Sequence, residues 1–284
     1  MNEKMKILAI FVIYNPDISL LHRNIGAVYE YVDSIIVWDN SSETNFAPAF
    51  LNKEKVKYIN KGINLGLSKA YNYAWKYAKE NEFSHLLTMD QDSTFEDFGL
   101  YLSDIKKANE VAIFVPYVEH IVFKKLKSDI QEVDTAINSG ALIPIEILKA
   151  TNGYYEDFLL DMVDEEFFQH ARALGYKILK LKNHRLIHCF GNSKEIRLFH
   201  KHICWNVGYS PKRIYGICRN RMIVFHKYHL PKKDMFIYIF RDFKNFVKMF
   251  LFESNKLIKS KAYLYGYFDG IFNKSSRIYK FDEK

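Results

Sequence analysis

Two carboxylates one residue apart, Asp90 and Asp92, end an apolar run of strand character that begins at His85. Side chains at positions i and i+2 of an extended chain point to the same side, so these two carboxylates can share one hard cation. Ligands of open α/β sheets bind at the carboxyl ends of the strands. A divalent ion held there can take its remaining oxygen ligands from a diphosphate. The pair therefore predicts a metal site, although a solvated acidic turn would have the same local sequence.

Two further turns offer groups to a nucleotide. Asp39 follows a second strand-like run and could accept hydrogen bonds from a base or a ribose, although an Asx turn explains it locally. The segment from Asn64 to Gly66 precedes a helical run. Gly66 allows close backbone approach, and the helix N-terminus offers free N–H groups to an anion. An ordinary strand-to-helix turn accounts for that segment equally well.

An acidic cluster stands at the expected start of a later helix and consists of Asp161, Asp164, Glu165 and Glu166. Acidic residues there complement the helix dipole, which is a structural explanation. However, apolar residues 158–160 precede the cluster, and two phenylalanines follow it. A carboxylate pressed against an apolar surface acquires the raised proton affinity that a general base needs.

Imidazole and thiol groups gather within 21 residues, at His184, His188, Cys189, His200, His202 and Cys204. Their spacing lacks the paired framing of a structural zinc site. We therefore expect most of them to be surface or packed residues. One of them could be a further ligand of the metal that the aspartate pair would hold.

Basic residues concentrate in the last quarter of the chain. Residues 212–284 hold 17 Lys and Arg against 6 Asp and Glu, whereas residues 1–211 hold 24 against 27. Arg213 and Arg219 lie six residues apart on one expected helix, so roughly one face can carry both toward a phosphate, or toward solvent. The aromatic, basic segment 235–252 fits either an anionic membrane surface or a core-packing helix.

Strands alternating with helices position these groups and predict an α/β fold with a mostly parallel, Rossmann-like sheet flanked by helices. The expected strands are residues 6–14, 34–38, 56–59, 85–90, 111–115, 138–144 and 176–181. The expected helices are residues 69–79, 96–108, 161–174, 212–228, 233–252 and 255–272. Asp17 or Ser19 could cap a helix after the first strand, and Gly175 should end the helix that starts at 161. Residues 119–134 are expected to form a charged hairpin or excursion.

Composition supports a folded globular chain. Hydrophobic residues make up 49% of the 284 residues and charged residues 26%, which excludes a disordered chain. We expect neither a signal peptide nor a membrane span, because no cleavage site follows the first residues and no uncharged apolar run is long enough. Three cysteines form no disulfide framework and suit a reducing cytoplasm.

Taken in order, eight motifs resemble those of the inverting nucleotide-sugar glycosyltransferases of family two, which have the GT-A fold, and especially their rhamnosyltransferase-like branch. The motifs are Tyr14-Asn15-Pro16, Trp38 to Ser42, Asn64 to Gly66, Asp90 to Ser93, Ser139-Gly140, Asp161 to Glu166, His188, and Ser210 to Asn220. Phe167 and His170 depart from the family's usual Trp and Arg, on the acceptor side of the site.

The resemblance implies a catalytic GT-A domain over residues 1–210 and a basic helical extension over residues 211–284. It implies that the nucleotide-sugar donor contacts Asn15, Asp39, Asn64, Gly66, Asp90, Ser139, Gly140, Arg213 and Arg219, with Ser139 and Gly140 lining the acceptor side. It also implies that Asp90, Asp92 and His188 hold Mg²⁺ or Mn²⁺. Asp164 would be the catalytic base, with Glu165 and Glu166 as alternatives.

The expected reaction moves a sugar, rhamnose from a dTDP donor, onto a lipid-linked saccharide in bacterial surface polysaccharide synthesis. The enzyme would work in the cytoplasm, peripherally on the inner face of the membrane. Another sugar from a UDP donor (galactofuranose, glucose or galactose) is the alternative. A different class, a non-catalytic nucleic-acid-binding protein, would use the basic C-terminal region. Because the acidic strand ends would repel nucleic-acid phosphates, we expect no nucleic acid partner.

Overall fold

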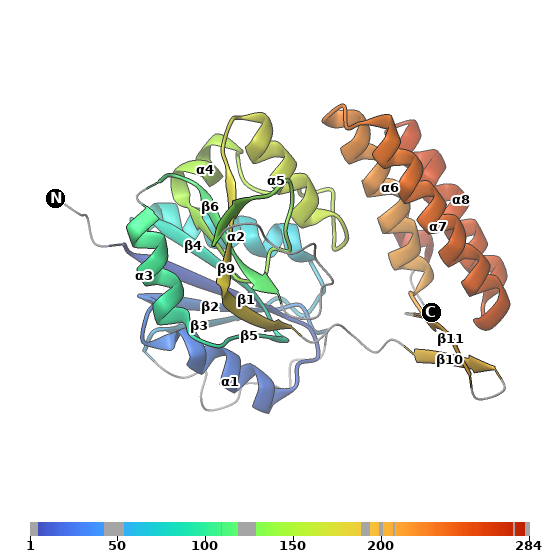
Figure 1. Ribbon diagram of the computed structural model, residues 1–284. Coiled ribbons are helices and arrows are strands. Elements are labelled where there is room, and N and C mark those ends of the chain that lie inside the picture. The colour runs from blue at the N-terminus through green and yellow to red at the C-terminus, as the bar shows by residue number, and fades with distance from the viewer. Residues whose placement is uncertain are drawn as a thin grey trace. The chain divides into compact units, whose positions relative to one another are not determined.

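The computed structural model describes residues 5–42, 54–108, 110–118, 129–188, 194–198, 201–206, 208–274 and 276–281. The chain forms two compact units, drawn in Figure 1. The first comprises residues 1–159 and 163–189, and the second comprises residues 160–162 and 190–284. The short segment 160–162 therefore belongs to the second unit, although the chain on either side of it belongs to the first.

A nine-stranded sheet is the centre of the first unit (Figure 1). Its strands are β1 (Ile7–Ile13), β2 (Ser34–Asp39), β3 (Val56–Asn60), β4 (His85–Asp90), β5 (Ser93–Phe95), β6 (Ile113–Val118), β7 (Ile130–Glu132), β8 (Ala141–Pro144) and β9 (Ile178–His188). The order is β3-β2-β1-β4-β8-β6-β9-β5, and β7 pairs with β9. Strands β3, β2, β1 and β4 are parallel, and so are β6 and β9. The predicted mostly parallel sheet is confirmed.

Three strands run against the predicted direction of the sheet. β8 is antiparallel to both of its neighbours, β4 and β6, and the short strands β5 and β7 pair antiparallel with β9. The antiparallel sense of β8 could not be read from hydrophobicity, because buried strands of either direction have the same apolar composition. The short strands β5 and β7 were not among the strands predicted from the sequence.

Helices cover both faces of the sheet. Alternate residues of β1 pack with α1 (Ile18–Tyr29) and α3 (Phe98–Ala108), while α2 (Leu67–Glu80) contacts β1 and β4. Every residue of β1 is consequently buried, which explains its continuous apolar run. A short helix α4 (Ile145–Ala150) follows β8, and α5 (Val163–Ala173) precedes β9. Asp17 caps α1 as predicted, since its Oδ1 accepts a hydrogen bond from the Leu20 N–H (3.0 Å).

The second unit contains three long helices, α6 (Pro211–Lys227), α7 (Lys232–Phe252) and α8 (Lys256–Ile271), and a 3₁₀ turn (Ile278–Phe281). It also contains a hairpin that the sequence did not predict, formed by β10 (Lys194–Leu198) and β11 (Lys201–Asn206). The predicted C-terminal helices are confirmed. Two glycines let α8 approach α6: a Cβ at Gly270 would lie 2.5 Å from the Arg219 carbonyl oxygen. None of the described helices has the length and hydropathy needed to cross a bilayer.

One predicted boundary is wrong for a local reason. The acidic helix was expected to begin at residue 161, but α5 begins at Val163. Met162 has a positive φ of 68°, a left-handed conformation that cannot continue a right-handed helix. At the other end Gly175 also has a positive φ, of 90°, just beyond the last helical residue, as expected of a helix stop.

Candidate active site

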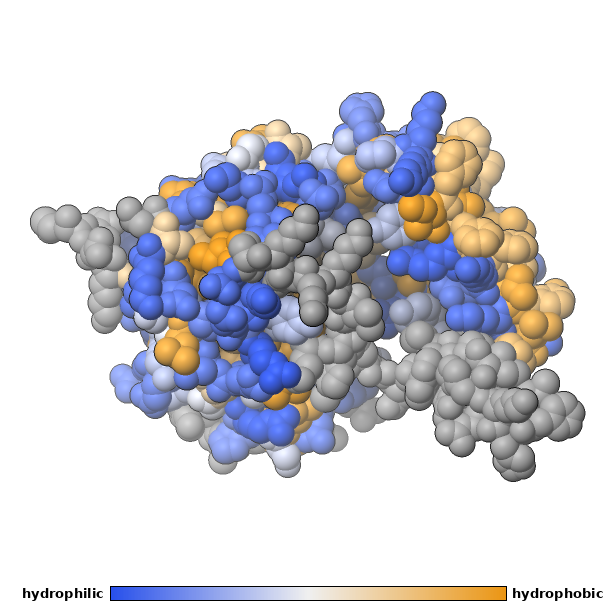
Figure 2. Space-filling model, in the orientation of Figure 1, coloured by the Kyte–Doolittle hydropathy of each residue, from blue (hydrophilic) through white to orange (hydrophobic). Residues whose placement is uncertain are grey.

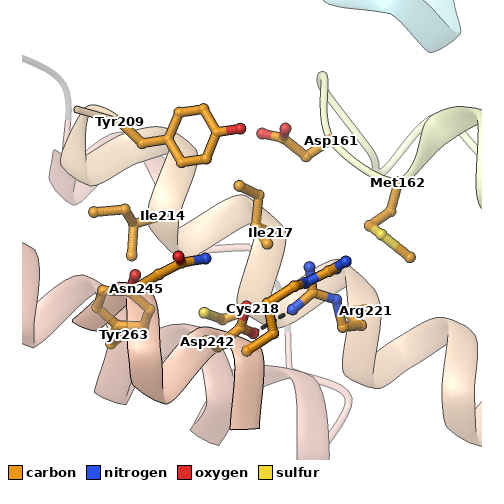
Figure 3. Close-up of a pocket in the computed structure, with 11 residues that line it drawn as sticks. Asp161, Met162, Tyr209, Ile214, Ile217, Cys218, Arg221, Asp242, Asn245 and Tyr263 are labelled. Carbon is orange, nitrogen blue, oxygen red and sulfur yellow. Dashed lines mark hydrogen bonds and ion pairs between the residues drawn. The ribbon is translucent and has the colours of Figure 1, made fainter. Parts of the chain in front are cut away.

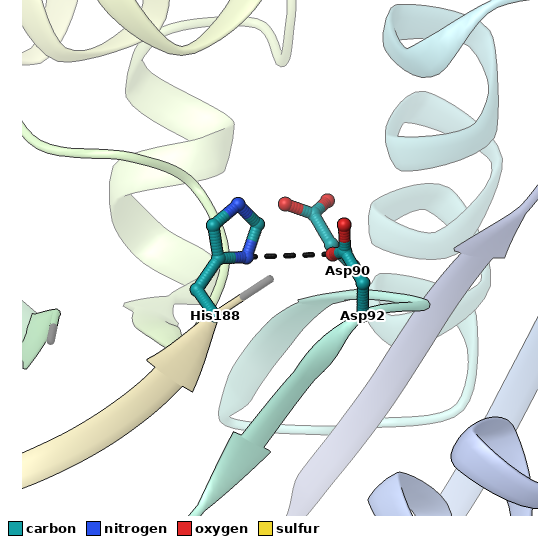
Figure 4. A group of neighbouring side chains, drawn as sticks. All are labelled: Asp90, Asp92 and His188. Atoms are coloured by element: carbon teal, nitrogen blue, oxygen red, sulfur yellow. Dashed lines mark ion pairs between the residues drawn. The ribbon is translucent and has the colours of Figure 1, made fainter. Parts of the chain in front are cut away.

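The predicted acidic pair lies at the carboxyl end of β4. Asp90 is the last residue of this strand, and Asp92 lies in the two-residue link to β5. One ligand atom from each of Asp90, Asp92 and His188 lies within 4.8 Å of the others (Figure 4). The three side chains that the family resemblance assigned to one metal are therefore neighbours in space.

Strand pairing brings His188 to this group from a distant part of the chain. Its partner in the antiparallel pairing of β5 with β9 is Ser93, the residue after Asp92. The His188 Nδ1 atom lies 2.6 Å from the Ser93 hydroxyl and 3.4 Å from Asp92 Oδ1. The ring is thus oriented by the residues next to the aspartate pair, as second contacts orient histidine ligands in metal sites.

The turn that carries the two carboxylates is fixed by hydrogen bonds from three other segments. The backbone N–H of Asp90 donates to the buried Ser139 hydroxyl (3.0 Å), at the start of β8. The Gln91 carbonyl accepts from the Asn24 amide, and its side-chain oxygen accepts from the Tyr14 N–H, both at 2.7 Å. Ser139, predicted to line the acceptor side, therefore supports the end of β4 in this structure.

The pKa values of Asp90 and Asp92 are both raised, as expected for carboxylates in a site that lacks positive charge. Burial, and then the negative charges of Asp92 and Asp164, raise the pKa of Asp90 to about 7. Burial likewise raises the pKa of Asp92, although His188 opposes that shift, and burial lowers the pKa of His188. A bound cation would offset this repulsion between carboxylates.

The three candidate bases differ in their surroundings. Asp164 lies in the first turn of α5, and its charge acts on Asp90 and on the buried Tyr71 and Tyr154, so its carboxylate lies near the acidic pair. Glu165 accepts hydrogen bonds from Thr135 (2.6 Å) and Gln169 (3.2 Å). The third carboxylate, that of Glu166, is only 1% exposed.

The residues predicted to hold the nucleotide lie at the ends of β1 and β2. Asp39 is buried, and its two oxygens accept from the Ser41 N–H (2.8 Å) and the Tyr58 hydroxyl (2.5 Å). Burial and the hydrogen bond to Asp39 raise the pKa of Tyr58 to about 12. The Asn15 N–H donates to the Ser41 hydroxyl (2.8 Å), which ties the ends of β1 and β2 together.

Asn40 connects these strand ends to the third predicted segment, and no separate role was predicted for it. Its Oδ1 accepts from the Leu65 N–H (3.1 Å), and its amide donates to the Gly66 carbonyl (3.3 Å). Asn64 closes the same turn by accepting from the Gly66 N–H (2.9 Å). The signal for Asn40 was its place in the Asp-Asn-Ser-Ser run, where an amide can bond the backbone of a neighbouring turn.

Glycine is needed at two predicted positions because the chain packs closely against itself. Gly66 has a φ of 83°, and a Cβ there would lie 2.4 Å from the Leu159 carbonyl oxygen. Gly140 has a φ of 81°, and a Cβ there would lie 2.6 Å from Pro116 Cγ. The close approach inferred for Gly66 is therefore made by the chain's own backbone.

The two predicted arginines belong to the second unit and do not share a face of α6. Arg213 is exposed, and its Nε donates to Asp161 Oδ1 (3.0 Å). Arg219 is 2% exposed, and its guanidinium donates to the Lys274 carbonyl (3.0 Å) and to Asn220 (3.1 Å). Its observed contacts stabilise the helical unit.

The zinc alternative has no support in the described part of the chain. His184 is buried and bonds Asp104 through Nε2 (2.9 Å), with its ring edge against Tyr101. Cys189 and His200 lie outside the described residues, as do residues 119–128 of the expected charged excursion. The structure likewise does not describe the side chains of His202 and Cys204.

Comparison with known proteins gives matches at several levels. Residues 9–137 match the model of the family "Glycosyl transferase family 2". The chain is 26% identical over 247 residues to the dTDP-rhamnosyl transferase RfbF of Shigella flexneri. The aligned region covers 79% of this chain and 81% of that protein.

Solved structures agree in fold. TarS 1–349 of S. aureus, solved in complex with UDP-GlcNAc, superposes with a TM-score of 0.55 at 15% identity, over 94% of this chain and 82% of that one. GalNAc-T7, solved with UDP, GalNAc and Mn²⁺, gives a TM-score of 0.55 at 14% identity over 80% of this chain. The match spans about half (48%) of the GalNAc-T7 chain. Residues 9–137, with the end of β4 that carries the acidic pair, are therefore a glycosyltransferase family 2 domain, and the chain has the GT-A type of fold.

Proposed function

We propose that this chain is an inverting, metal-dependent rhamnosyltransferase. It would transfer rhamnose from dTDP-rhamnose to a lipid-linked saccharide during the synthesis of a bacterial surface polysaccharide. The observation that carries the proposal is the cluster of Asp90, Asp92 and His188 at the carboxyl end of β4 in a family 2 domain. The similarity to a dTDP-rhamnosyl transferase supports the choice of donor.

The residues of this cluster fit a divalent cation. Two carboxylate oxygens are the ligands that Mg²⁺ and Mn²⁺ prefer, and an imidazole nitrogen is a further ligand suited to a transition metal. The raised pKa of Asp90 indicates a site where a cation would relieve repulsion. When bound, the ion would offset the negative charge that develops on the departing nucleoside diphosphate.

Asp164 is the base that the surroundings favour. Glu165 is engaged by Thr135 and Gln169, and Glu166 is buried, whereas Asp164 lies near the acidic pair. Asp164 would accept the proton of the acceptor hydroxyl as that oxygen attacks the anomeric carbon. Attack on the face opposite the leaving group would invert the configuration of that carbon.

The donor pocket would be built by the ends of β1 and β2 and by the turn before α2. Hydrogen bonds through Asn40 and Ser41 join these three segments. Asn15, Asp39, Asn64 and Gly66 would contact the nucleotide there, as the resemblance implies. Ser139 and Gly140 would act beneath it by holding the end of β4.

We also propose that the helical unit rests on an anionic membrane surface at the cytoplasmic side, where a lipid-linked acceptor would be found. Exposed phenylalanines on α7, including Phe236, Phe240 and Phe243, support this association. Lys244 and Lys248 lie on the same helix, and the region as a whole is strongly basic. Such a combination of apolar and basic side chains suits a lipid interface.

The test is hydrolysis of the donor by the purified full chain with Mn²⁺ or Mg²⁺, in which water takes the place of the saccharide acceptor. dTDP-rhamnose, UDP-glucose, UDP-galactose and UDP-galactofuranose are offered separately, and release of the nucleotide is measured by chromatography. We expect dTDP release alone, complete dependence on the metal, and an inverted anomeric configuration in any product analysed by NMR. If the protein consumes only a UDP-sugar, that UDP-sugar is the donor and the assignment of dTDP-rhamnose is wrong.

Two variants distinguish an effect on the metal site from an effect on folding. Asp92→Asn should reduce turnover at least 1,000-fold, because it removes one of the two carboxylate ligands. Asp97→Asn is the matched control: Asp97 is exposed and caps α3, and asparagine caps a helix equally well. Full activity of Asp92→Asn would refute the metal-dependent mechanism.

A further inference from the structure

A cavity of about 390 Å³ lies within the second unit (Figure 3). Its walls come from the segment 160–162 and from α6, α7 and α8. The polar groups that matter to the argument are those of Asp161, Arg221, Arg241, Asp242, Asn245 and Tyr263. Neither the family match, which ends at residue 137, nor the acidic site in the first unit accounts for this cavity.

The buried arginine of the cavity has an unused donor. Arg221 is 6% exposed and forms an ion pair through Nη1 with Asp242, which also accepts from the Tyr267 hydroxyl (2.7 Å). The Arg221 Nε–H, by contrast, has no hydrogen-bond partner among the described residues. A buried donor without an acceptor is costly, so an arginine N–H left unpaired beside a cavity indicates an acceptor that the protein itself does not supply.

The charges around the cavity leave an excess of positive charge. Both carboxylates are already neutralised: Asp242 by Arg221, and Asp161 by Arg213, whose Nε donates to it (3.0 Å). Arg241 forms no ion pair within the described residues, and its guanidinium lies over the Tyr238 ring, 4.6 Å from the centroid. One guanidinium charge therefore remains without a countercharge.

The remaining polar groups are hydrogen-bond donors. The Arg221 Nε–H and the Arg241 guanidinium can only donate, and the amide of Asn245 and the hydroxyl of Tyr263 can donate as well. Burial raises the pKa of Tyr263, so its hydroxyl keeps its proton. Several donors and one excess positive charge suit a phosphate group, which offers acceptor oxygens only. A neutral sugar, whose hydroxyls also donate, would find the two carboxylates occupied.

Apolar side chains complete the surroundings of this polar group. Met162, Ile214 and Ile217 line the cavity, and α7, which supplies Arg241, exposes Phe240 and Phe243 on either side of it in sequence. Figure 2 shows hydrophobic residues gathered on the surface of the C-terminal helices. A phosphate that carries an apolar chain fits these surroundings better than a free ion does, because both of its parts find suitable contacts.

We propose that this cavity binds the phosphate group of an amphiphilic phosphate ester. Identifying that ester with the lipid carrier of the acceptor rests on the function proposed above, whereas the anion chemistry of the cavity does not. Inorganic phosphate or diphosphate shares this chemistry and is distinguished by the experiment.

The experiment is calorimetric titration of the full chain with geranyl diphosphate and, separately, with inorganic diphosphate. EDTA is present throughout, so that no metal at Asp90 and Asp92 captures either probe. We expect geranyl diphosphate to bind at least tenfold more tightly than inorganic diphosphate. Its Kd should weaken at least tenfold in Arg241→Gln, whose side chain is exposed and whose loss leaves no buried carboxylate unpaired.

Two more variants sharpen the test. Arg221→Lys keeps the charge opposite Asp242 but removes the Nε–H, and it should also weaken binding tenfold or more. Lys244→Gln makes the same change of charge as Arg241→Gln, one turn along α7 but outside the cavity, and should change the Kd less than twofold. Melting curves of all variants check that they fold.

Absence of binding, or equal binding by the wild type and Arg241→Gln, would overturn the inference. Equal affinity for the two probes would overturn the amphiphilic part and assign the cavity to a free anion. The result is independent of the transferase reaction. Arginine-dependent binding without donor consumption would refute the proposed function alone, and donor consumption without binding would refute this inference alone.

Discussion

Burial and the negative charges of its neighbours both disfavour the ionised form of Asp90. Its pKa of about 7 means that the metal-free protein holds a proton there below neutral pH. A metal ion must displace this proton, so we predict that Mn²⁺ affinity falls about tenfold per pH unit as the pH decreases from 7 to 5. Titration of the wild type with Mn²⁺, followed by electron paramagnetic resonance, measures this; a pH-independent affinity would contradict it.

The same shift makes a prediction about stability. The folded pKa of Asp90 lies above the ordinary value of 3.8, so the native state holds this proton more tightly than the unfolded chain does. The free energy of unfolding therefore decreases as the pH rises from about 4 to about 7. Asp90→Asn should stabilise the metal-free protein at pH 8 by up to about 4 kcal/mol, at about 1.4 kcal/mol per pKa unit. Urea unfolding at pH 8 and pH 4 tests this, since no gain is expected at pH 4.

Gly66 was predicted to allow close backbone approach to a ligand, and in the structure it allows the close approach of Leu159. Gly66→Ala would place a methyl group 2.4 Å from the Leu159 carbonyl at a positive φ, so we expect a loss of at least about 2 kcal/mol in unfolding free energy. Gly62→Ala is the matched control, because Gly62 also has a positive φ (72°) but nothing within 4 Å of its added Cβ. Similar losses in the two variants, measured by urea unfolding, would show that backbone strain alone matters.

The sequence predicted the acidic pair because its chemistry depends on spacing within one strand. Spacing within one strand could not show that His188 lies beside this pair, because its position depends on the register of β5 with β9. Only the family resemblance indicated His188 as a ligand. The hydrogen bond from Asp90 to the Ser139 hydroxyl and the burial of Arg219 also depend on tertiary contacts. Helix periodicity suggested that Arg219 shares a face of α6 with Arg213, whereas Arg219 is 2% exposed and Arg213 is exposed.

At the scale of elements, α7 is the helix whose exposed side differs most from an ordinary soluble surface. Phe240 and Phe243 are each 60% exposed. Because partial insertion of two phenylalanines contributes on the order of 2 kcal/mol, we predict that the double variant Phe240→Ser/Phe243→Ser binds anionic vesicles at least tenfold more weakly. Co-sedimentation with phosphatidylglycerol vesicles measures this.

Leu100→Ser is the control for that experiment, because Leu100 is similarly exposed (59%) but lies on α3 of the first unit. Vesicle binding should be unchanged in this variant. Equal loss in both variants, or no loss in the double variant, would argue against α7 as the membrane contact.

Element boundaries followed from the sequence where a local signal sets them. Apolar runs marked β1, β2 and β4, and periodicity marked α6 to α8, because both signals lie within the element itself. The β10–β11 hairpin and the start of α5 were missed. The first has no strong apolar alternation, and the second depends on the left-handed conformation of Met162.

On the scale of the whole molecule, the chain passes between its two compact units three times, after residues 159, 162 and 189. Composition alone suggested a boundary from the increase in basic residues. Composition could not assign the three residues 160–162 to the helical unit, because they are held there by specific contacts. The Asp161 carboxylate accepts from Arg213, and its carbonyl accepts from the Asn220 amide (2.9 Å).

This division predicts two separate ligand responses in hydrogen exchange. Mn²⁺ with dTDP should slow exchange at residues 85–95 and 178–188, because the acidic pair and His188 lie there within the first unit. Geranyl diphosphate in the presence of EDTA should instead slow exchange in α6 and α7, which line the cavity of the second unit. In Arg241→Gln the second response should disappear while the first persists, because the two sets of residues belong to different units. Protection of α6 and α7 by geranyl diphosphate that survives in Arg241→Gln would mean that this arginine is not what holds the phosphate, whereas loss of both responses would mean that the substitution disturbs the whole chain.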